Sequence, residues 1–196
     1  MSLYELPADL PAPIDDGACD HLQGLAVPAL VLESSHGPVD LAELGAELAV
    51  LYVYPRTGHP GRPVPAGWDA IPGARGCTPQ SCGFRDHAAE LSAAGARVAG
   101  LSAQTLEGQV EFAEREHMPF PVVADPERKL GAELRLPTFE FEGATLYRRI
   151  TLVLEAGKVA KAFYPVFPPD RNAAEVVAWL TGRSEACRQA SASVPR

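Results

Sequence analysis

The sequence predicts an α/β domain in which a mixed central sheet is flanked by helices on both faces. Residues 48–54 form a continuous run of apolar, β-branched and aromatic side chains, which is typical of a strand buried on both faces. After residue 77, helical patterns alternate with short strand patterns. The chain has 196 residues, of which 46% are hydrophobic, and this suits one domain with a substantial core.

The first part of the chain contains one clear strand and a long loop. Residues 1–25 predict an irregular N-terminal arm, and residues 27–32 predict a short strand. The buried strand over 48–54 ends at Pro55. Residues 56–76 are rich in proline and glycine and predict a loop. Loops of this length are uncommon inside a compact domain and are often functional.

Helices and strands alternate in the second part of the chain. Phe84, Ala88 and Leu91 fall on one face of a helix predicted over 78–94. Thr105 is suited to cap the next helix. The other predictions are strands over 97–101 and 122–124, a short helix over 125–134, a hairpin of strands 149–154 and 158–164, and a helix over 172–180. We therefore expect the folded domain to span residues 26–183 and a flexible tail to follow over 184–196.

Charge and hydropathy exclude several classes of partner. The net charge of −8 argues against nucleic acid, because phosphate binding needs clustered lysine and arginine. Residues 1–13 are polar and proline-rich, without the basic start and apolar core of a secretory signal. The sequence has no apolar run close to the roughly 18 residues of a membrane span. We expect a cytoplasmic protein that does not bind membranes.

The chain has four cysteines, at positions 19, 77, 82 and 187. Without an export signal, this even number is interpreted as catalytic or metal-binding, and not as a disulfide framework. Zinc sites favour two-residue spacings and further ligands, and His87 is the only candidate nearby, so we predict no metal site. We expect Cys19 and Cys187 to take no part in the chemistry.

Cys77 and Cys82 lie at the predicted start of a helix. Unpaired backbone N–H groups and the helix dipole favour a thiolate at such a position. A separation of five residues corresponds to about 500° of rotation and roughly 7.5 Å of rise along a helix. A disulfide needs Cβ atoms about 3.8 Å apart, so this pair can join only if the first helical turn melts. The alternative is two inert core cysteines.

Several motifs together resemble the active-site segment of peroxiredoxins, especially the bacterioferritin-comigratory or Q-type group. The matching residues are Tyr54-Pro55, Gly76-Cys77-Thr78, Cys82, Phe84-Arg85-Asp86 and the strand Arg149–Leu154. The similarity extends to about Leu180. It implies a thioredoxin-like fold and a thiol peroxidase that reduces hydrogen peroxide or organic hydroperoxides without a metal or other cofactor.

The resemblance also implies a role for each matching residue. Cys77 would be the peroxidatic thiolate that attacks the O–O bond and becomes a sulfenic acid. Cys82 would be the resolving thiol that forms an intramolecular disulfide with it. Arg149 would stabilise the thiolate and hold the peroxide oxygens. Its neighbour Arg148 competes for this role, because strand alternation puts the two on opposite faces.

Further expectations concern the pocket and the partners. Gln80 would support the arginine, and Pro55 and Thr78 would help to form the substrate pocket. The expected partners are the peroxide and thioredoxin or a similar dithiol reductant, with the chain as a monomer or homodimer.

The sequence departs from the family pattern just before Cys77. The family has threonine or serine three residues before the peroxidatic cysteine, where this chain has Ala74. The family proline stands seven residues before the cysteine, whereas Pro55 lies 22 positions before it (77 − 55). A proline- and glycine-rich insertion over about 56–76 accounts for the difference. Thr57 and Thr78 are candidates to replace the missing hydroxyl, and Trp68 either caps the pocket or anchors the loop.

Two other functions remain open on these residues. One is a redox-sensing or interaction protein on the same fold, in which the insertion and the lost threonine have weakened peroxidase turnover. The other is a thioredoxin-like disulfide oxidoreductase, although such enzymes usually have two residues between their cysteines, and this chain has four.

Overall fold

The computed structural model describes the backbone of residues 4–192 and the side chains of residues 4–184. Within that range, a five-stranded mixed sheet forms the centre of the molecule. In spatial order its strands are β5 (Val122–Ala124), β4 (Arg97–Ser102), β3 (Ala49–Val53), β8 (Ile150–Glu155) and β9 (Lys158–Phe163). β3 runs parallel to β4 and antiparallel to β8. The predicted fold class, a mixed sheet with flanking helices, is confirmed.

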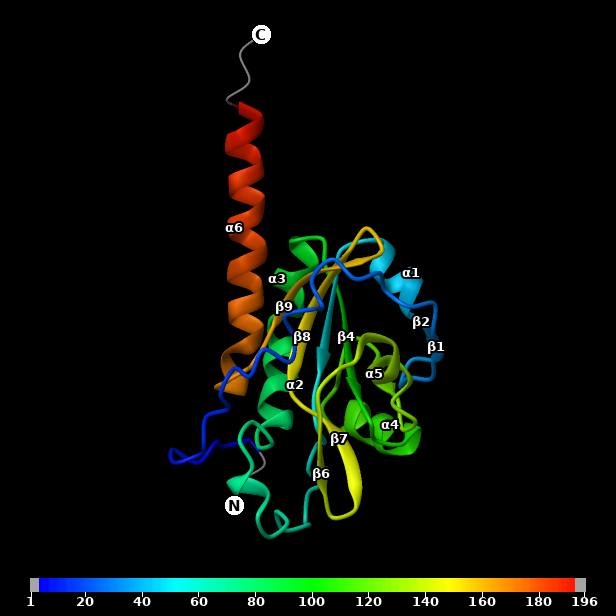
Figure 1. Ribbon diagram of the computed structural model, residues 1–196, viewed down its shortest axis with the longest axis vertical. Coiled ribbons are helices and arrows are strands. Elements are labelled where there is room, and N and C mark those ends of the chain that lie inside the picture. Colours follow the sequence, from blue (N-terminus) through cyan, green and yellow to red (C-terminus); the bar gives the residue numbers. More distant parts are fainter. Residues whose placement is uncertain (1–3, 193–196) are drawn as a thin grey trace.

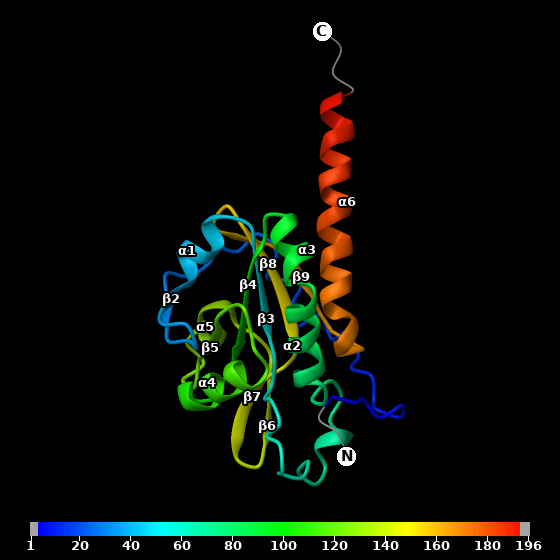
Figure 2. The ribbon, with the colours of Figure 1, turned by 180° about the vertical axis from the view of Figure 1, so that it is seen from behind.

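Helices cover both faces of the sheet, as Figure 1 and Figure 2 show from opposite sides. The helices are α1 (Leu41–Ala46), α2 (Cys77–Asp86), α3 (Ala88–Ala93), α4 (Leu106–Arg115), α5 (Lys129–Leu134) and α6 (Asn172–Ala192). Phe84 of α2, Phe112 of α4 and Val176 of α6 pack in one core. Leu44 of α1 and Leu130 of α5 pack in the other core.

The central strand shows why a continuous apolar run was required. Every residue of β3 is buried. Val50 and Tyr52 belong to the core beneath α2 and α6, whereas Leu51 and Val53 belong to the core beneath α1 and α5. Successive side chains of a strand point to opposite faces, so a strand covered on both sides must be apolar at every position.

Smaller elements surround the sheet. β6 (Thr138–Phe141) and β7 (Ala144–Tyr147) form an antiparallel hairpin, and β1 (Val31–Leu32) pairs with β2 (Val39–Asp40). Two short 3₁₀ helices are η1 (Trp68–Ala70) and η2 (Pro169–Arg171). The β6–β7 hairpin extends beyond the sheet at the end where α2 begins, next to the loop that contains η1 (Figure 1). This end of the sheet carries the candidate site.

The structure corrects several predicted boundaries. The helix predicted over 78–94 is divided into α2 and α3 at His87, whose ring Nδ1 lies 2.9 Å from the Gly83 carbonyl oxygen and whose backbone leaves the helical region. The short helix starts at Lys129, because the Asp125 carboxylate caps it by accepting from the backbone N–H groups of residues 129 and 130. The strand predicted over 27–32 contains only Val31–Leu32.

Other elements differ in extent or were missed. The helix predicted to end at Leu180 continues to Ala192, since residues 181–192 contain no proline and are rich in good helix formers. Residues 184–192, expected in a tail, are therefore helical, and residues 193–196 lie outside the described part. α1 and the β6–β7 hairpin were not predicted from the sequence. Among residues 4–192, no helix combines the length and apolar character needed to cross a membrane.

Candidate active site

Cys77 is the first residue of α2, and the backbone before it is held in one unusual conformation. Gly76 precedes the helix with φ of 97°, a left-handed value that favours glycine. A Cβ atom at Gly76 would lie 2.8 Å from Leu6 Cδ2 and closer still to Pro169. Only glycine fits this position, so the sulfur is fixed at the end of the helix where unpaired N–H groups and the dipole stabilise an anion.

Arg149 is fixed in contact with the Cys77 sulfur. Its Nη2 lies 3.3 Å from Sγ and also donates to the carbonyl oxygens of Ala74 at 3.2 Å and Arg75 at 3.0 Å. Nη1 donates to Oε1 of Gln80. Arg149 is 3% exposed and immediately precedes β8 instead of belonging to the strand. A buried cation held by several acceptors favours a neighbouring thiolate.

A chain of buried polar side chains orients Arg149 from the protein interior. Gln80 is fully buried, and its Nε2 donates to Asn172 Oδ1 at 3.0 Å. Thr151 Oγ1 donates to the same oxygen at 2.6 Å. The amide of Gln80 thereby presents its oxygen to the arginine. Asn172 was not singled out in the sequence, although an asparagine at the first residue of a helix is a recognisable signal.

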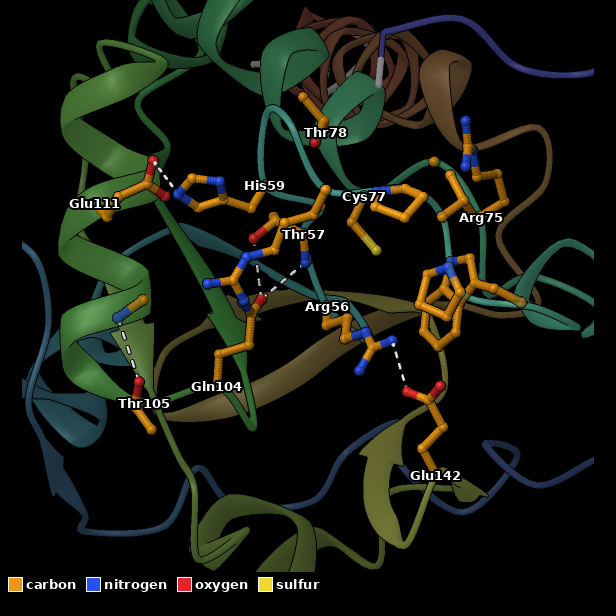
Figure 3. Close-up of a pocket in the computed structure, with 18 of the residues that line it drawn as sticks. Arg56, Thr57, His59, Arg75, Cys77, Thr78, Gln104, Thr105, Glu111 and Glu142 are labelled. Atoms are coloured by element: carbon orange, nitrogen blue, oxygen red, sulfur yellow. Dashed lines mark hydrogen bonds and ion pairs between the residues drawn. The ribbon is translucent and has the colours of Figure 1, made fainter. Parts of the chain in front are cut away.

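Cys77 opens into a cavity of about 630 Å³. Figure 3 shows its sulfur on the cavity side, with Thr57 on one side and Arg75 on the other. Thr57 and Thr78, the two candidates for the missing hydroxyl, both line this cavity. Arg149, Gln80 and Pro55 do not line it, so the arginine reaches the sulfur from the protein interior.

The predicted insertion provides much of the cavity wall. Lining residues come from the segment 56–65, from Trp68 and from the start of α4. The backbone N–H and the hydroxyl of Thr57 donate to Gln104 Oε1 at 2.8 and 3.1 Å. Thr57 follows β3 and Gln104 follows β4; the carboxyl ends of these parallel strands meet at one edge of the sheet, a common place for binding sites. This was a usable signal for Gln104.

Trp68 anchors the loop over residues 56–76 and also lines the cavity. It is 5% exposed, and its ring centroid lies 4.9 Å from that of Phe141 and 6.1 Å from that of Phe139. The Arg56 guanidinium lies 4.8 Å from the Trp68 ring centroid and 3.4 Å from the Glu142 carboxylate. The β6–β7 hairpin therefore supports the loop, which explains how this long segment forms a defined wall.

Cys82 lies in a different environment from Cys77. It is partly buried, and its thiol donates to Glu116 Oε2 at 3.6 Å. Burial raises the Cys82 pKa to about 11, with Glu116 adding to the increase and Arg85 opposing it. At neutral pH Cys82 is therefore a protonated thiol, which is a poor nucleophile. The two cysteines contact groups on separate elements, as expected for five residues of helix.

The remaining candidates lie away from the site. Cys19 is buried, and burial together with nearby aspartates raises its pKa to about 12. The side chain of Cys187 lies outside the described residues. Arg148 is partly exposed, does not line the cavity beside Cys77, and its charge acts on Asp16 and Tyr164. Among the described side chains, no group of three or more histidines, cysteines and carboxylates is placed to hold a metal.

Comparison with known proteins assigns the family. The Redoxin family model matches residues 22–178. The chain is 30% identical over 160 residues to the chloroplastic peroxiredoxin Q of Sedum lineare, covering 81% of this chain and 77% of that protein. The chain belongs to the redoxin family as a Q-type peroxiredoxin. A putative peroxiredoxin bcp of Coxiella burnetii is 26% identical over 161 residues, covering 80% of this chain and 97% of the relative.

Solved structures agree with this assignment. The crystal structure of peroxidoxin BcpB from Mycobacterium tuberculosis superposes with a TM-score of 0.67 at 26% identity, covering 83% of this peroxiredoxin and 98% of that chain. The thioredoxin-like fold is confirmed. As a peroxiredoxin, the chain is a thiol peroxidase that acts on peroxide with a thiol reductant.

Proposed function

We propose that Cys77 is the peroxidatic thiolate of this peroxiredoxin and that Cys82 resolves it. The observation that carries the proposal is the 3.3 Å contact between Arg149 Nη2 and Cys77 Sγ at the first residue of α2, beside a cavity. Charge, helix terminus and access coincide at this sulfur alone among the cysteines whose side chains are described. Cys19 and Cys82 have raised pKa values, and Arg85 near Cys82 only partly opposes the increase there.

The reaction follows in two chemical steps. The Cys77 thiolate attacks one oxygen of the peroxide, the O–O bond breaks, and the other oxygen leaves as water or an alcohol after taking up a proton. Cys77 is then a sulfenic acid. The Cys82 sulfur attacks the Cys77 sulfur, an S–S bond forms, and the hydroxyl group leaves with the Cys82 proton as water. The two thiols supply the two electrons that reduce the peroxide.

Substrate contacts on the cavity side come from the chain after β3. The Thr57 hydroxyl donates to Gln104, which leaves its oxygen lone pairs free to accept a hydrogen bond from a bound hydroperoxide. Thr57 therefore supplies the hydroxyl that is absent at Ala74. Arg149 acts on the sulfur and on the oxygen bound to it, and does not form the wall of the cavity.

Recycling requires an external dithiol. We assign it to thioredoxin or a similar protein, because an intramolecular disulfide on an unwound helix start is accessible to thiol–disulfide exchange. The two chemical steps use residues of one chain, so either a monomer or a homodimer satisfies them.

Peptide mapping after one equivalent of hydrogen peroxide tests the assignment. We expect a Cys77–Cys82 disulfide in the wild-type chain, its absence in Cys77→Ser, and a Cys77 sulfenic acid in Cys82→Ser. Cys19→Ser is the matched control and is expected to behave as wild type. Oxidation of Cys19 or Cys187 with Cys77 still reduced would overturn the proposal.

A further inference from the structure

Glu116 is a buried carboxylate that the peroxidase steps above leave without a role. It follows the last residue of α4 and is 4% exposed. Its Oε2 accepts the Cys82 thiol at 3.6 Å across 34 residues of sequence. Its Oε1 accepts the Tyr4 hydroxyl at 3.0 Å and an N–H of Arg115. Removing a carboxylate from water costs free energy, which hydrogen bonds and ion pairs with its partners must offset. These contacts fix the position of the Glu116 side chain.

A second residue of α2 contacts the same glutamate. Arg85 lies three residues after Cys82, on the same face of the helix. Its Nη1 donates to the Glu116 backbone carbonyl at 2.8 Å and lies 3.9 Å from Oε2. Glu116 therefore links two positions of α2 that lie about one helical turn apart to the end of α4. The helix that must unwind for disulfide formation is attached at the very thiol that has to move.

We propose that Glu116 is a positioning residue that retains Cys82 on the folded helix and thereby sets the rate of the disulfide-forming step. The inference rests on the proposed roles of Cys77 and Cys82. The Cys82–Glu116 hydrogen bond must break before the sulfur can approach Cys77. The hydrogen bond is therefore present in the folded helix and absent when the two sulfurs react. It slows disulfide formation and leaves the rate of Cys77 oxidation by peroxide unchanged.

The charge of Glu116 acts in the same direction. The charged groups that face Cys82 are Arg85 and Asp86 on α2 and Glu116 just after α4, with Arg115 paired to the glutamate. Glu116 and Asp86 raise the pKa of the Cys82 thiol and Arg85 lowers it, in addition to the larger effect of burial. While Cys82 stays beside Glu116 it is protonated and unreactive. The proton leaves the Cys82 sulfur only after the helix opens, and it ends in the water that forms with the departing hydroxyl group.

This retention gives the Cys77 sulfenic acid a longer lifetime. During that time a second peroxide molecule can oxidise it to a sulfinic acid, which the resolving thiol no longer reduces. Glu116 therefore controls how the sulfenic acid divides between the disulfide and over-oxidation.

Glu116→Gln tests the proposal by removing the charge and keeping the shape. The matched control is Glu114→Gln, the same change at an exposed position of α4 two residues away. Stopped-flow mixing with peroxide, followed by acid quenching and mass spectrometry, gives the rates of Cys77 oxidation and of disulfide formation separately. We expect Glu116→Gln to form the disulfide about three- to tenfold faster, the factor for weakening one ordinary hydrogen bond. Cys77 oxidation should stay within about twofold of wild type.

Two further readouts separate positioning from general loosening of the fold. In a variant with Cys82 as its single thiol, the thiolate absorbance near 240 nm should titrate at lower pH with Glu116→Gln than with Glu116 or with Glu114→Gln. The sulfinic acid fraction at excess peroxide should fall. Unchanged or slower disulfide formation, or an unmoved Cys82 titration, overturns the inference.

If Glu116→Gln does not fold, Glu116→Asp provides the test, because it keeps the charge and withdraws the oxygen from the sulfur. It should also accelerate disulfide formation, and an unchanged rate overturns the proposal. Failure of the proposed site is recognised separately, since Cys77→Ser would then still consume peroxide. If Cys77 is oxidised normally and the Glu116 variants form the disulfide at the wild-type rate, the proposed roles of Cys77 and Cys82 are kept and this inference fails.

Discussion

Replacing Arg149 with methionine should slow peroxide attack strongly while leaving the sulfur and the cavity in place. The guanidinium is buried and donates one hydrogen bond to Cys77 Sγ. A hydrogen bond to a charged group contributes about 1.5–3 kcal/mol. Because about 1.4 kcal/mol corresponds to a tenfold change in rate, we expect the oxidation of Cys77 to its sulfenic acid to slow by about 10- to 100-fold.

Arg149→Met should also destabilise the fold, and the assay must keep the two effects apart. The substitution leaves the carbonyl oxygens of Ala74 and Arg75 and the Gln80 amide without their donor. Each unsatisfied buried acceptor costs about 1–3 kcal/mol unless water replaces the donor. Urea unfolding gives the loss of stability, and stopped-flow oxidation is then measured at a temperature where the variant is folded.

Arg148→Met is the matched control for this experiment. It removes a neighbouring arginine that is partly exposed and does not line the cavity beside Cys77. Its oxidation rate should stay within about twofold of wild type, the ordinary range for a surface change without a shared partner. Equal rates for folded Arg149→Met and wild type, or a larger loss in Arg148→Met, would refute the assignment of the cation.

Three further predictions concern Cys82 and the scaffold. In Cys77→Ser, iodoacetamide should modify Cys82 slowly at pH 9 and faster as the pH rises towards the Cys82 pKa of about 11, whereas the unfolded chain should react readily at pH 9. Peptide mapping over a series of pH values measures this reaction. Half-maximal reactivity of Cys82 below pH 9 would contradict the prediction. Tyr147→Phe removes a hydroxyl that donates to Asp125 at 2.7 Å, and should lower the free energy of unfolding by about 1–3 kcal/mol without changing Cys77 oxidation. An unchanged urea midpoint of Tyr147→Phe would contradict this prediction. Gly76→Ala places an alanine in the left-handed backbone region and against η2. It should lower the free energy of unfolding by about 2 kcal/mol or more and slow the attack of Cys77 on peroxide. Wild-type stability together with a wild-type oxidation rate rules out this account of the helix start.

Some elements missed in the sequence had a local signal that was available. Phe139, Glu140 and Phe141 alternate in character, and Glu142-Gly143 follows them, a pattern typical of a short hairpin. The hairpin matters because Phe139 and Phe141 support Trp68 and the cavity wall. In contrast, the predicted helix is divided at His87, where the backbone leaves the helical region and the ring Nδ1 contacts the Gly83 carbonyl oxygen, which the helical periodicity did not reveal.

The sequence by itself determined the properties that depend on nearby residues. The apolar run of β3, the Thr105 cap of α4 and the position of Cys77 at a helix start all follow from side chains within a few positions of each other. The spacing between Cys77 and Cys82 likewise settled that the helix must open before the two sulfurs meet, because helical geometry is the same in every protein.

Only the tertiary structure decided which distant groups surround the two sulfurs. It placed Arg149, 72 residues away, against Cys77, and Glu116 against Cys82. It also turned the proline- and glycine-rich loop into one wall of a cavity by packing Trp68 on the β6–β7 hairpin. Local preferences cannot specify such contacts, because each depends on how strands and helices far apart in the chain pack around the shared sheet.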